Sequence, residues 1–333
     1  MSKAAAADTD ALAKAIAGGD RRALAQAITL VESTRPEDRP GADALLEKLL
    51  PRTGKSIRLG ISGSPGVGKS TFIETFGLHV VAQGHRLAVL AVDPSSRISG
   101  GSILGDKTRM ADLATDPRAF IRPSPAGQTL GGVARRSREA LLLCEAAGHD
   151  VVLVETVGVG QSETAVADMT DMFLLLLQPG GGDELQGIKR GIVELADLIL
   201  VNKADGEMLE AAGRTAADYQ HALRLLRPAT AGWQPEVLRC SALTGTGIPE
   251  VWQKVEAFQK AVGKTAIAER RARQARSWLR SELADSLMEA IARHPDLARR
   301  LPALEADVAA GSATPGAAAR SLLAGILGGK AGK

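Results

Sequence analysis

The sequence predicts an α/β fold in which a mostly parallel central sheet is flanked by helices. Between residues 56 and 245, short apolar runs alternate with stretches of helical spacing. The runs are apolar on both faces, which is typical of parallel strands covered by helices on each side. A glycine-rich loop also separates the first run from the helical stretch after it. The predicted strands are Ile57–Ser62, Leu87–Asp93, Val151–Thr156, Phe173–Leu177, Leu198–Asn202 and Val237–Cys240, with Ala119–Arg122 as a further candidate.

Composition divides the chain into three parts. We predict a helical extension at residues 1–50, a central domain at 51–248 and a helical arm at 249–333. The first part is rich in alanine and leucine with helical spacing, and Pro36–Gly41 interrupts it. The arm carries a run of arginines beside an apolar stripe at Leu279, Leu283, Leu287 and Ile291. A solvated amphipathic helix and a docking or dimerisation helix both fit this pattern, and both remain open.

The composition disfavours several classes of function. Of 333 residues, 45% are hydrophobic and 24% are charged, as in ordinary globular proteins. The net charge of +3 is too small to indicate binding to nucleic acid or to a membrane surface. The most apolar segment, Met172–Leu177, is far shorter than a spanning helix, and the first residues lack a secretory pattern, so we expect a cytoplasmic protein. Cys144 and Cys240 lie far apart and the five histidines are scattered, which disfavours a Cys/His metal site.

Residues 63–70, GSPGVGKS, match the phosphate-binding pattern GxxxxGK[ST] in full. The segment lies between a predicted strand and a predicted helix, where backbone N–H groups at the helix N-terminus can bind phosphates. Lys69 can reach the β- and γ-phosphates, and the Ser70 hydroxyl can ligate Mg²⁺. The predicted nucleotide-binding residues here are Gly63, Ser64, Pro65, Gly66, Val67, Gly68, Lys69, Ser70 and Thr71.

Two later loops predict guanine as the base. Asn202-Lys203-Ala204-Asp205 follows a predicted strand and matches the NKxD pattern of GTPases. The Asp205 carboxylate can accept hydrogen bonds from guanine N1–H and N2–H₂, which adenine does not present together, so adenine would leave it unsatisfied. Lys203 can cover the base with its alkyl chain, and Asn202 can connect this loop to the phosphate-binding loop. Ser241-Ala242-Leu243 follows the last predicted strand, where GTPases place a loop whose backbone contacts guanine O6.

Acidic residues at strand ends are candidates for the metal site and the γ-phosphate. Glu155-Thr156-Val157-Gly158 stands in the place of the DxxG element, with Glu where most GTPases have Asp. We predict that Glu155 faces Mg²⁺ through water and that the Gly158 N–H donates to the γ-phosphate. Asp93 ends a strand at the edge where α/β sheets bind ligands, so it can hold Mg²⁺ or orient the attacking water, although a turn cap before Pro94 is the alternative. Asp106 has a weaker claim from the sequence.

Together these segments resemble the MeaB/ArgK family of GTPases, which associate with adenosylcobalamin-dependent methylmalonyl-CoA mutase. The matching segments are GISGSPGVGKST at 60–71, AVDPSS at 91–96, GDKTRM at 105–110, ETVGVGQSE at 155–163, LQPGGGDELQGIKRGI at 177–192 and VNKADG at 201–206. The resemblance implies a P-loop NTPase of the SIMIBI class with GTP or GDP and Mg²⁺ as ligands. It also implies an acidic cluster of Asp93, Asp106 and Glu155 at the metal. One departure from the wider class is Ser64, which stands where Min-type ATPases carry a signature lysine.

The resemblance further implies a homodimer formed largely through the C-terminal arm. GTP hydrolysis would be coupled to protecting the mutase from inactivation and to gating cobalamin loading. No residue of the sequence is identified as an arginine finger, and Gln161 is a candidate for a catalytic glutamine. We therefore expect slow intrinsic hydrolysis that a partner accelerates.

Three other functions compete with this one. A nickel-delivery GTPase of the same class needs a Cys/His cluster, and tight nickel binding would favour it. A kinase or transport ATPase would bind adenine, against which Asp205 argues, and competition between guanine and adenine nucleotides decides this. A purely structural module would hold GTP without hydrolysing it, even with its partner present.

Overall fold

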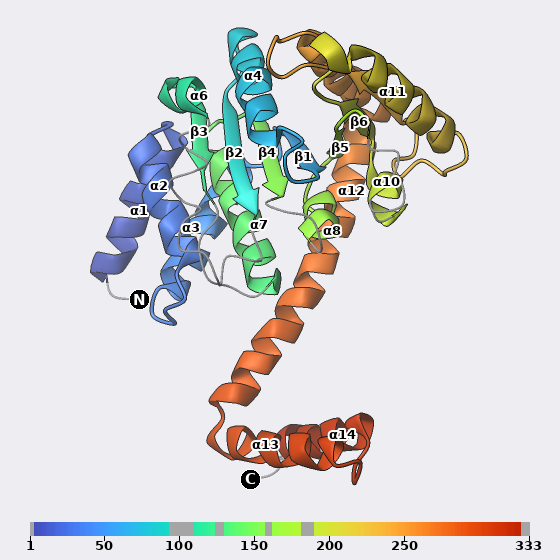
Figure 1. Cartoon of the computed structure of the whole chain (residues 1–333). Helices are drawn as coiled ribbons and strands as arrows, with labels where there is room; N and C mark the ends of the chain where they lie inside the picture. Colours follow the sequence, from blue (N-terminus) through green and yellow to red (C-terminus); the bar gives the residue numbers. More distant parts are fainter. Residues whose placement is uncertain (1–2, 93–109, 124–129, 157–161, 181–189, 328–333) are drawn as a thin grey trace. The chain divides into compact units, whose positions relative to one another are not determined.

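The computed structural model describes residues 3–92, 110–123, 130–156, 162–180 and 190–327, and these form a parallel sheet with helices on its faces and further helices at the C-terminal end (Figure 1). Two compact units are present, residues 1–274 and residues 275–333. The N-terminal helices and the first part of the long helix α12 belong to the first unit. The domain boundaries expected at residues 50 and 248 remain predictions from the sequence.

Seven parallel strands make up the sheet, in the order β3-β2-β4-β1-β5-β6-β7. They are β1 (Ile57–Gly63), β2 (Leu87–Val92), β3 (Ala119–Arg122), β4 (Val151–Thr156), β5 (Met172–Leu177), β6 (Leu198–Val201) and β7 (Glu236–Arg239). Because all strands are parallel, their carboxyl ends meet at one edge, with β1 in the centre. The predicted α/β class and all seven predicted strands are confirmed, with ends that differ by a residue at most.

Helices connect the strands and extend both ends of the chain. They are α1 (Lys3–Ala17), α2 (Arg21–Glu32), α3 (Arg39–Leu49), α4 (Lys69–Ala82), α6 (Ala111–Thr115), α7 (Leu130–Ala146), α8 (Ser162–Ala167), α10 (Arg190–Leu195), α11 (Leu209–Leu223), α12 (Ile248–Arg293), α13 (Pro295–Ala309) and α14 (Pro315–Leu327), with 3₁₀ turns at Leu50–Arg52 and Gly206–Met208. Gly263 has non-helical angles (φ 76°, ψ 159°) and interrupts α12. Among the described residues, no helix is long and apolar enough to cross a membrane.

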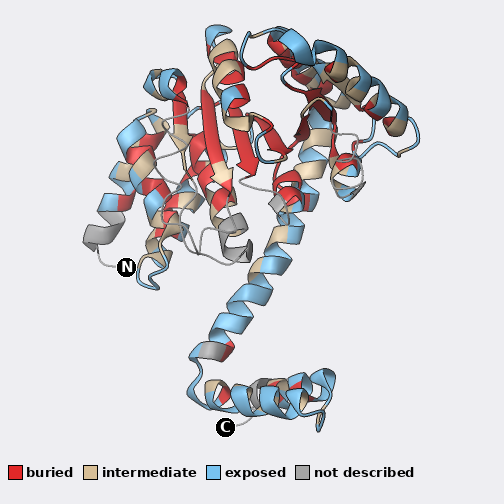
Figure 2. Cartoon of the chain, in the orientation of Figure 1, coloured by how far each residue is buried: buried red, intermediate tan, exposed pale blue. Residues whose placement is uncertain are grey.

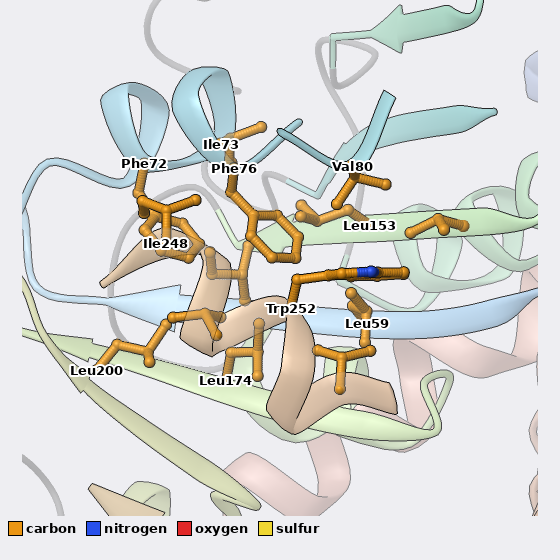
Figure 3. Close-up of a cluster of buried hydrophobic side chains, with 14 of the residues drawn as sticks. Leu59, Phe72, Ile73, Phe76, Val80, Leu153, Leu174, Leu200, Ile248 and Trp252 are labelled. Carbon is orange, nitrogen blue, oxygen red and sulfur yellow. The ribbon is translucent and has the colours of Figure 1, made fainter. Parts of the chain in front are cut away.

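The main core lies between one face of the sheet and the helices α4 and α12 (Figure 2). Phe76 of α4 and Trp252 of α12 pack together above the sheet, with ring centroids 6.1 Å apart (Figure 3). Each large apolar side chain buried here contributes about 1.5–3 kcal/mol to the free energy of folding. This packing fixes α4, and therefore the loop before it, on β1.

The opposite face of β1 carries α8. A side chain at Gly60 would lie within 3.0 Å of Phe173, Thr170 and Val166. Neighbouring residues of a strand point to opposite faces, so Ile61 faces the α4 side and Gly60 the α8 side. Only glycine at position 60 allows this close approach of α8 to the strand that leads into the nucleotide loop.

Buried ion pairs join α12 to the amino-terminal edge of the sheet. Arg271 donates to both carboxylate oxygens of Asp171, at 2.8 and 2.5 Å, and Asp171 is fully buried. Asp171 also accepts a 2.8 Å bond from the backbone N–H of Arg58 in β1. The neighbouring Arg270 donates to Thr230 at 2.7 Å and lies 3.9 Å from Asp197. Two residues of the arginine run thus bind the domain that contains the sheet.

The N-terminal helices pack against α7 of the same unit. Asp20 caps α2, since its side chain accepts hydrogen bonds from the backbone N–H groups of Arg22 and Ala23 at 2.8 and 2.9 Å. Gly19 precedes it with φ 82° and ends the preceding helix. From the sequence we expected a break only at Pro36–Gly41 and missed this earlier one.

The second unit has a small core of its own. Ile291, Leu297 and Leu322 are buried together, and Leu301 and Leu304 pack against them. Three residues of the apolar stripe stay largely exposed, with Leu279 at 60%, Leu283 at 61% and Leu287 at 50%. Ile291 is therefore the one member of the stripe that this core covers.

Candidate nucleotide-binding site

The phosphate-binding loop lies between β1 and α4, as the sequence predicts. Gly63 ends β1, and a Cβ there would lie 2.6 Å from the backbone oxygen of Leu176 in β5. Gly68 has φ 91°, a conformation that glycine adopts readily, and a Cβ there would lie 2.8 Å from the side-chain nitrogen of Asn202. These two glycines let the loop lie directly against β5 and the base-recognition loop.

Lys69, the first residue of α4, donates a 2.8 Å hydrogen bond from Nζ to the carbonyl oxygen of Gly63. Burial lowers the pKa of Lys69, and the nearby carboxylates of Glu155 and Glu163 oppose this effect. The ammonium group therefore reaches back to Gly63, the residue with which the loop begins. From this place it can bind the outer phosphates of a nucleotide.

The other predicted residues of the loop differ in exposure. Val67 is fully buried in the main core, whereas Pro65 and Gly66 are exposed. Ser64 Oγ is buried and has no hydrogen-bond partner among the described residues. Ser70 is half-buried at the second position of α4, and Thr71 is exposed. An orphaned hydroxyl beside exposed loop backbone fits a site that completes its hydrogen bonds with a ligand.

Asn202 connects the phosphate-binding loop to both base-recognition loops. Its Nδ2 donates to the carbonyl oxygen of Val67 at 2.9 Å, and its Oδ1 accepts from the backbone N–H of Ala242 at 3.0 Å. The side chain is 1% exposed, so these bonds form away from water. The predicted connection from Asn202 to the phosphate-binding loop is confirmed.

Two side chains of the Asn202–Asp205 loop bind the loops next to it. Lys203 donates from Nζ to the carbonyl oxygen of Gly66 at 2.7 Å, and it is the one non-glycine residue with positive φ in the described chain. The Ser241 hydroxyl donates to Oδ2 of Asp205. Leu243 is 82% exposed. The Asp205 carboxylate is thus held in place at the loop that follows β7.

Glu155 and Glu163 bring buried negative charge to the phosphate loop. Glu155 is 5% exposed and pairs in register with Ile61 of β1, so both point to the α4 face. Glu163 is 4% exposed at the start of α8. Glu163 belongs to a segment that carries the family resemblance, but it is not among the candidate site residues predicted from the sequence, because only the fold brings it near Lys69.

Asp93, Asp106 and Gly158 lie outside the described residues. Of the predicted metal ligands, the structure therefore describes Ser70 and Glu155. A hydroxyl and a buried carboxylate are oxygen donors of the kind that Mg²⁺ prefers. These two residues fit a magnesium ion.

This fold and site define a class of protein: a parallel sheet with a phosphate-binding loop after its central strand, and an NKxD loop fixed to it, form a P-loop GTPase. The family model described as "Methylmalonyl Co-A mutase-associated GTPase MeaB" matches residues 24–296. The chain belongs to this family, and it is a GTPase that binds GTP and GDP.

Similar proteins cover almost the whole chain. A "Putative GTPase" of Caulobacter vibrioides is 54% identical, over 95% of this chain and 97% of its own. The mouse "Methylmalonic aciduria type A homolog, mitochondrial" is 50% identical, over 94% and 78%, and "GTPase ArgK" of Escherichia coli is 49% identical, over 84% and 85%. A crystal structure described as "LAO/AO transport system kinase" has a TM-score of 0.76 at 38% identity, covering 98% of this chain and 99% of its own.

Proposed function

We propose that this GTPase is a chaperone of an adenosylcobalamin-dependent methylmalonyl-CoA mutase, which it protects from inactivation and whose cofactor loading it gates. The family description and the name of the mouse relative support this client. The structural observation that carries the nucleotide assignment is Asn202, whose side chain joins the phosphate-binding loop to the loop after β7. A single buried residue thereby couples recognition of the base to the position of the phosphates.

The proposed reaction is in-line attack of water on the γ-phosphate. Lys69 would leave the Gly63 carbonyl for the β- and γ-phosphates, and the loop N–H groups would donate to their oxygens. Ser70, Glu155, Asp93 and Asp106 would hold Mg²⁺, which supplies neutralisation of phosphate charge when bound. Asp93 would alternatively orient the water, and the Gly158 N–H would donate to the γ-phosphate.

We expect slow hydrolysis by the protein alone, because no residue of the sequence is identified as an arginine finger, and Gln161, the candidate catalytic glutamine, lies outside the described residues. An arginine finger contributes on the order of 10³–10⁵ in rate. We therefore expect that the mutase, when bound, completes or orders the catalytic site.

A homodimer formed through the second unit is part of the proposal. The exposed side chains of Leu279, Leu283 and Leu287 recur every fourth residue, which places them on one helix face. A neighbouring groove of about 520 Å³ is lined almost wholly by apolar side chains, among them Leu301 and Leu323. A second copy of the chain would cover both.

Analytical ultracentrifugation tests the dimer. We expect the wild-type protein to sediment as a dimer and the Leu283→Glu variant to shift toward the monomer. Ser281→Glu places the same charge on the opposite side of the helix and should leave the dimer intact. A monomeric wild-type protein, or equal behaviour of the two variants, would contradict this part of the proposal.

The central experiment measures GTP hydrolysis by the purified protein alone and with the mutase, with Lys69→Ala as the control. A slow basal rate that rises strongly with mutase is the expected result, and Lys69→Ala should abolish both rates. A rate unchanged by mutase, with no complex formed, would keep the GTPase and remove this client. No hydrolysis even in a formed complex would instead favour a module that only binds GTP.

The nickel-delivery alternative finds little support at the cysteines. Burial raises the pKa of both thiols, that of Cys240 to about 12, so neither thiol is set up as a thiolate ligand. The cytoplasmic location and the absence of nucleic-acid or membrane binding remain predictions from the sequence.

A further inference from the structure

Thr75, on the second turn of α4, binds the loop that follows β7. Its hydroxyl lies 2.7 Å from the carbonyl oxygen of Ala242 and 3.1 Å from that of Thr71. A helical threonine commonly donates to the carbonyl four residues earlier, and a hydroxyl has one hydrogen to give. The shorter distance favours Ala242 as the acceptor. Helix α4, which follows the phosphate-binding loop, therefore binds a backbone carbonyl of the Ser241–Leu243 loop.

The Ala242 carbonyl belongs to the same peptide unit as the Leu243 N–H. A trans peptide is planar with its C=O and N–H pointing in opposite directions. A bond that turns the carbonyl toward α4 therefore directs the Leu243 N–H away from α4. In the described part of the chain, this N–H has no hydrogen-bond partner.

The preceding peptide unit is fixed by other residues. The Ala242 N–H donates to Asn202 at 3.0 Å, and the Ser241 carbonyl accepts from the Gly245 N–H at 2.9 Å. The Ser241 hydroxyl also binds Asp205, which brings this loop next to the carboxylate that would read the base. Among the described side chains, Thr75 is thus the one that fixes the peptide unit between Ala242 and Leu243. Asn202 and the Gly245 N–H fix the unit between Ser241 and Ala242.

We propose that Thr75 is a positioning residue for guanine, which directs the Leu243 N–H at O6 of the base by holding the Ala242 carbonyl. The inference rests on the proposed binding of guanine by Asp205 and the Ser241–Leu243 loop. Guanine presents an acceptor at position 6, whereas adenine presents the N6–H₂ donor there. An N–H held in this direction can donate to guanine O6. Opposite adenine it would face the N6–H₂ donor and find no acceptor, so Thr75 contributes to the selection against adenine.

Three variants separate this role from a general effect on the helix. Thr75→Val removes the hydroxyl and keeps the shape of the side chain, while Thr75→Ser keeps the hydroxyl. Thr29→Val on α2 is the matched control, because Thr29 donates only to the carbonyl of Ala25, four residues earlier, at 3.0 Å. Each protein is titrated calorimetrically with GTP, with inosine triphosphate and with 6-thio-GTP, and the wild type is titrated with ATP as well.

The nucleotides differ at single positions of the base. Inosine lacks the N2 amine that Asp205 would bind and keeps O6, whereas 6-thioguanine keeps both donors and replaces O6 by sulfur, a weak acceptor. We expect Thr75→Val to weaken GTP and inosine triphosphate by about fivefold each, as for one lost hydrogen bond. It should weaken 6-thio-GTP clearly less, and Thr75→Ser and Thr29→Val should bind like the wild type.

Equal weakening of all three nucleotides by Thr75→Val, or no weakening of any, would overturn the role of Thr75. A wild-type protein that binds GTP, inosine triphosphate and ATP equally would instead overturn the proposed guanine site itself. The two failures are therefore distinguishable in one set of titrations.

Discussion

The side-chain amide of Asn202 donates a 2.9 Å hydrogen bond to the carbonyl oxygen of Val67, 135 residues earlier in the chain. Val67 is fully buried and precedes Gly68 and Lys69 in the phosphate-binding loop. The loop's conformation therefore depends on a residue of the base-recognition loop. Binding of the base and binding of the phosphates are expected to weaken together when this bond is lost.

Asn202→Ala should reduce both nucleotide affinity and stability. The substitution leaves the Val67 carbonyl and the Ala242 N–H buried without their partner, at a cost of about 1–3 kcal/mol each. We expect GTP affinity to fall at least about tenfold, as measured by calorimetry. Gln220→Ala removes a comparable amide bond to the Val237 N–H, away from the site. Equal GTP affinities for the two variants would refute the coupling.

Gly63→Ala should disrupt the phosphate-binding loop. The new Cβ would lie 2.6 Å from the Leu176 carbonyl oxygen, so β1 and β5 must separate. Overpacking of this kind costs about 1–3 kcal/mol, which corresponds to roughly a tenfold loss of GTP affinity if the loop gives way. Gly41→Ala in α3 is the control, since nothing lies within 4 Å of its Cβ. Titration with a fluorescent GTP analogue measures both, and an unchanged affinity in Gly63→Ala would show that the loop does not depend on this close contact between strands.

Arg271→Ala should destabilise the first unit. It leaves the fully buried Asp171 carboxylate without its guanidinium, and breaking such a pair costs about 3–5 kcal/mol. Urea unfolding followed by tryptophan fluorescence measures this loss. Arg273→Ala, at an exposed position two residues later, should change stability by no more than about 0.5 kcal/mol. If the two variants unfold alike, the ion pair contributes nothing to attaching α12.

Stability should fall between neutral and mildly acidic pH because of His149. Burial lowers the pKa of this residue to about 4, from an ordinary value near 6.5. Between these values the unfolded chain binds a proton that the folded protein does not. Stability from this group is therefore complete above about pH 6.5 and decreases as the pH falls, by about 2 kcal/mol at pH 5 relative to pH 8.

His149→Asn tests this dependence. Asparagine does not titrate and can still donate to the Cys144 carbonyl, which accepts from the His149 ring at 3.1 Å. Urea unfolding at pH 8 and pH 5 should show a smaller difference for this variant than for the wild type. The exposed His294→Asn serves as the control. An undiminished difference in His149→Asn would assign the pH dependence to other groups.

The strands and the nucleotide loop could be predicted because their signals are local. β4 and β5 are buried along their whole length, so each is recognisable as an apolar run without knowledge of its neighbours. The loop from Gly63 to Ser70 must bend at its glycines and carry charge at its lysine wherever it occurs. In both cases, the residues that determine the local structure lie close together in the sequence.

Contacts between distant residues could not be predicted in this way. Thr75 and Ala242 lie 167 residues apart, and nothing near Thr75 in the sequence distinguishes it from other helical threonines. Arg271 binds Asp171, 100 residues earlier, and the arginine run could equally have been solvated. The break at Gly19 did have a local signal, since Gly-Gly-Asp combines a helix end with an N-cap.

The central place of β1 in the sheet has a consequence for folding during synthesis on the ribosome. Its two neighbours, β4 and β5, are both later in the chain, and β5 ends about 110 residues after β1 does. At 5–20 residues per second, a ribosome needs roughly 6–20 seconds to supply them. During synthesis the nucleotide loop therefore exists for some time on an unpaired apolar strand. The nascent chain should acquire GTP binding only after β5 has left the ribosome, late and in a single step.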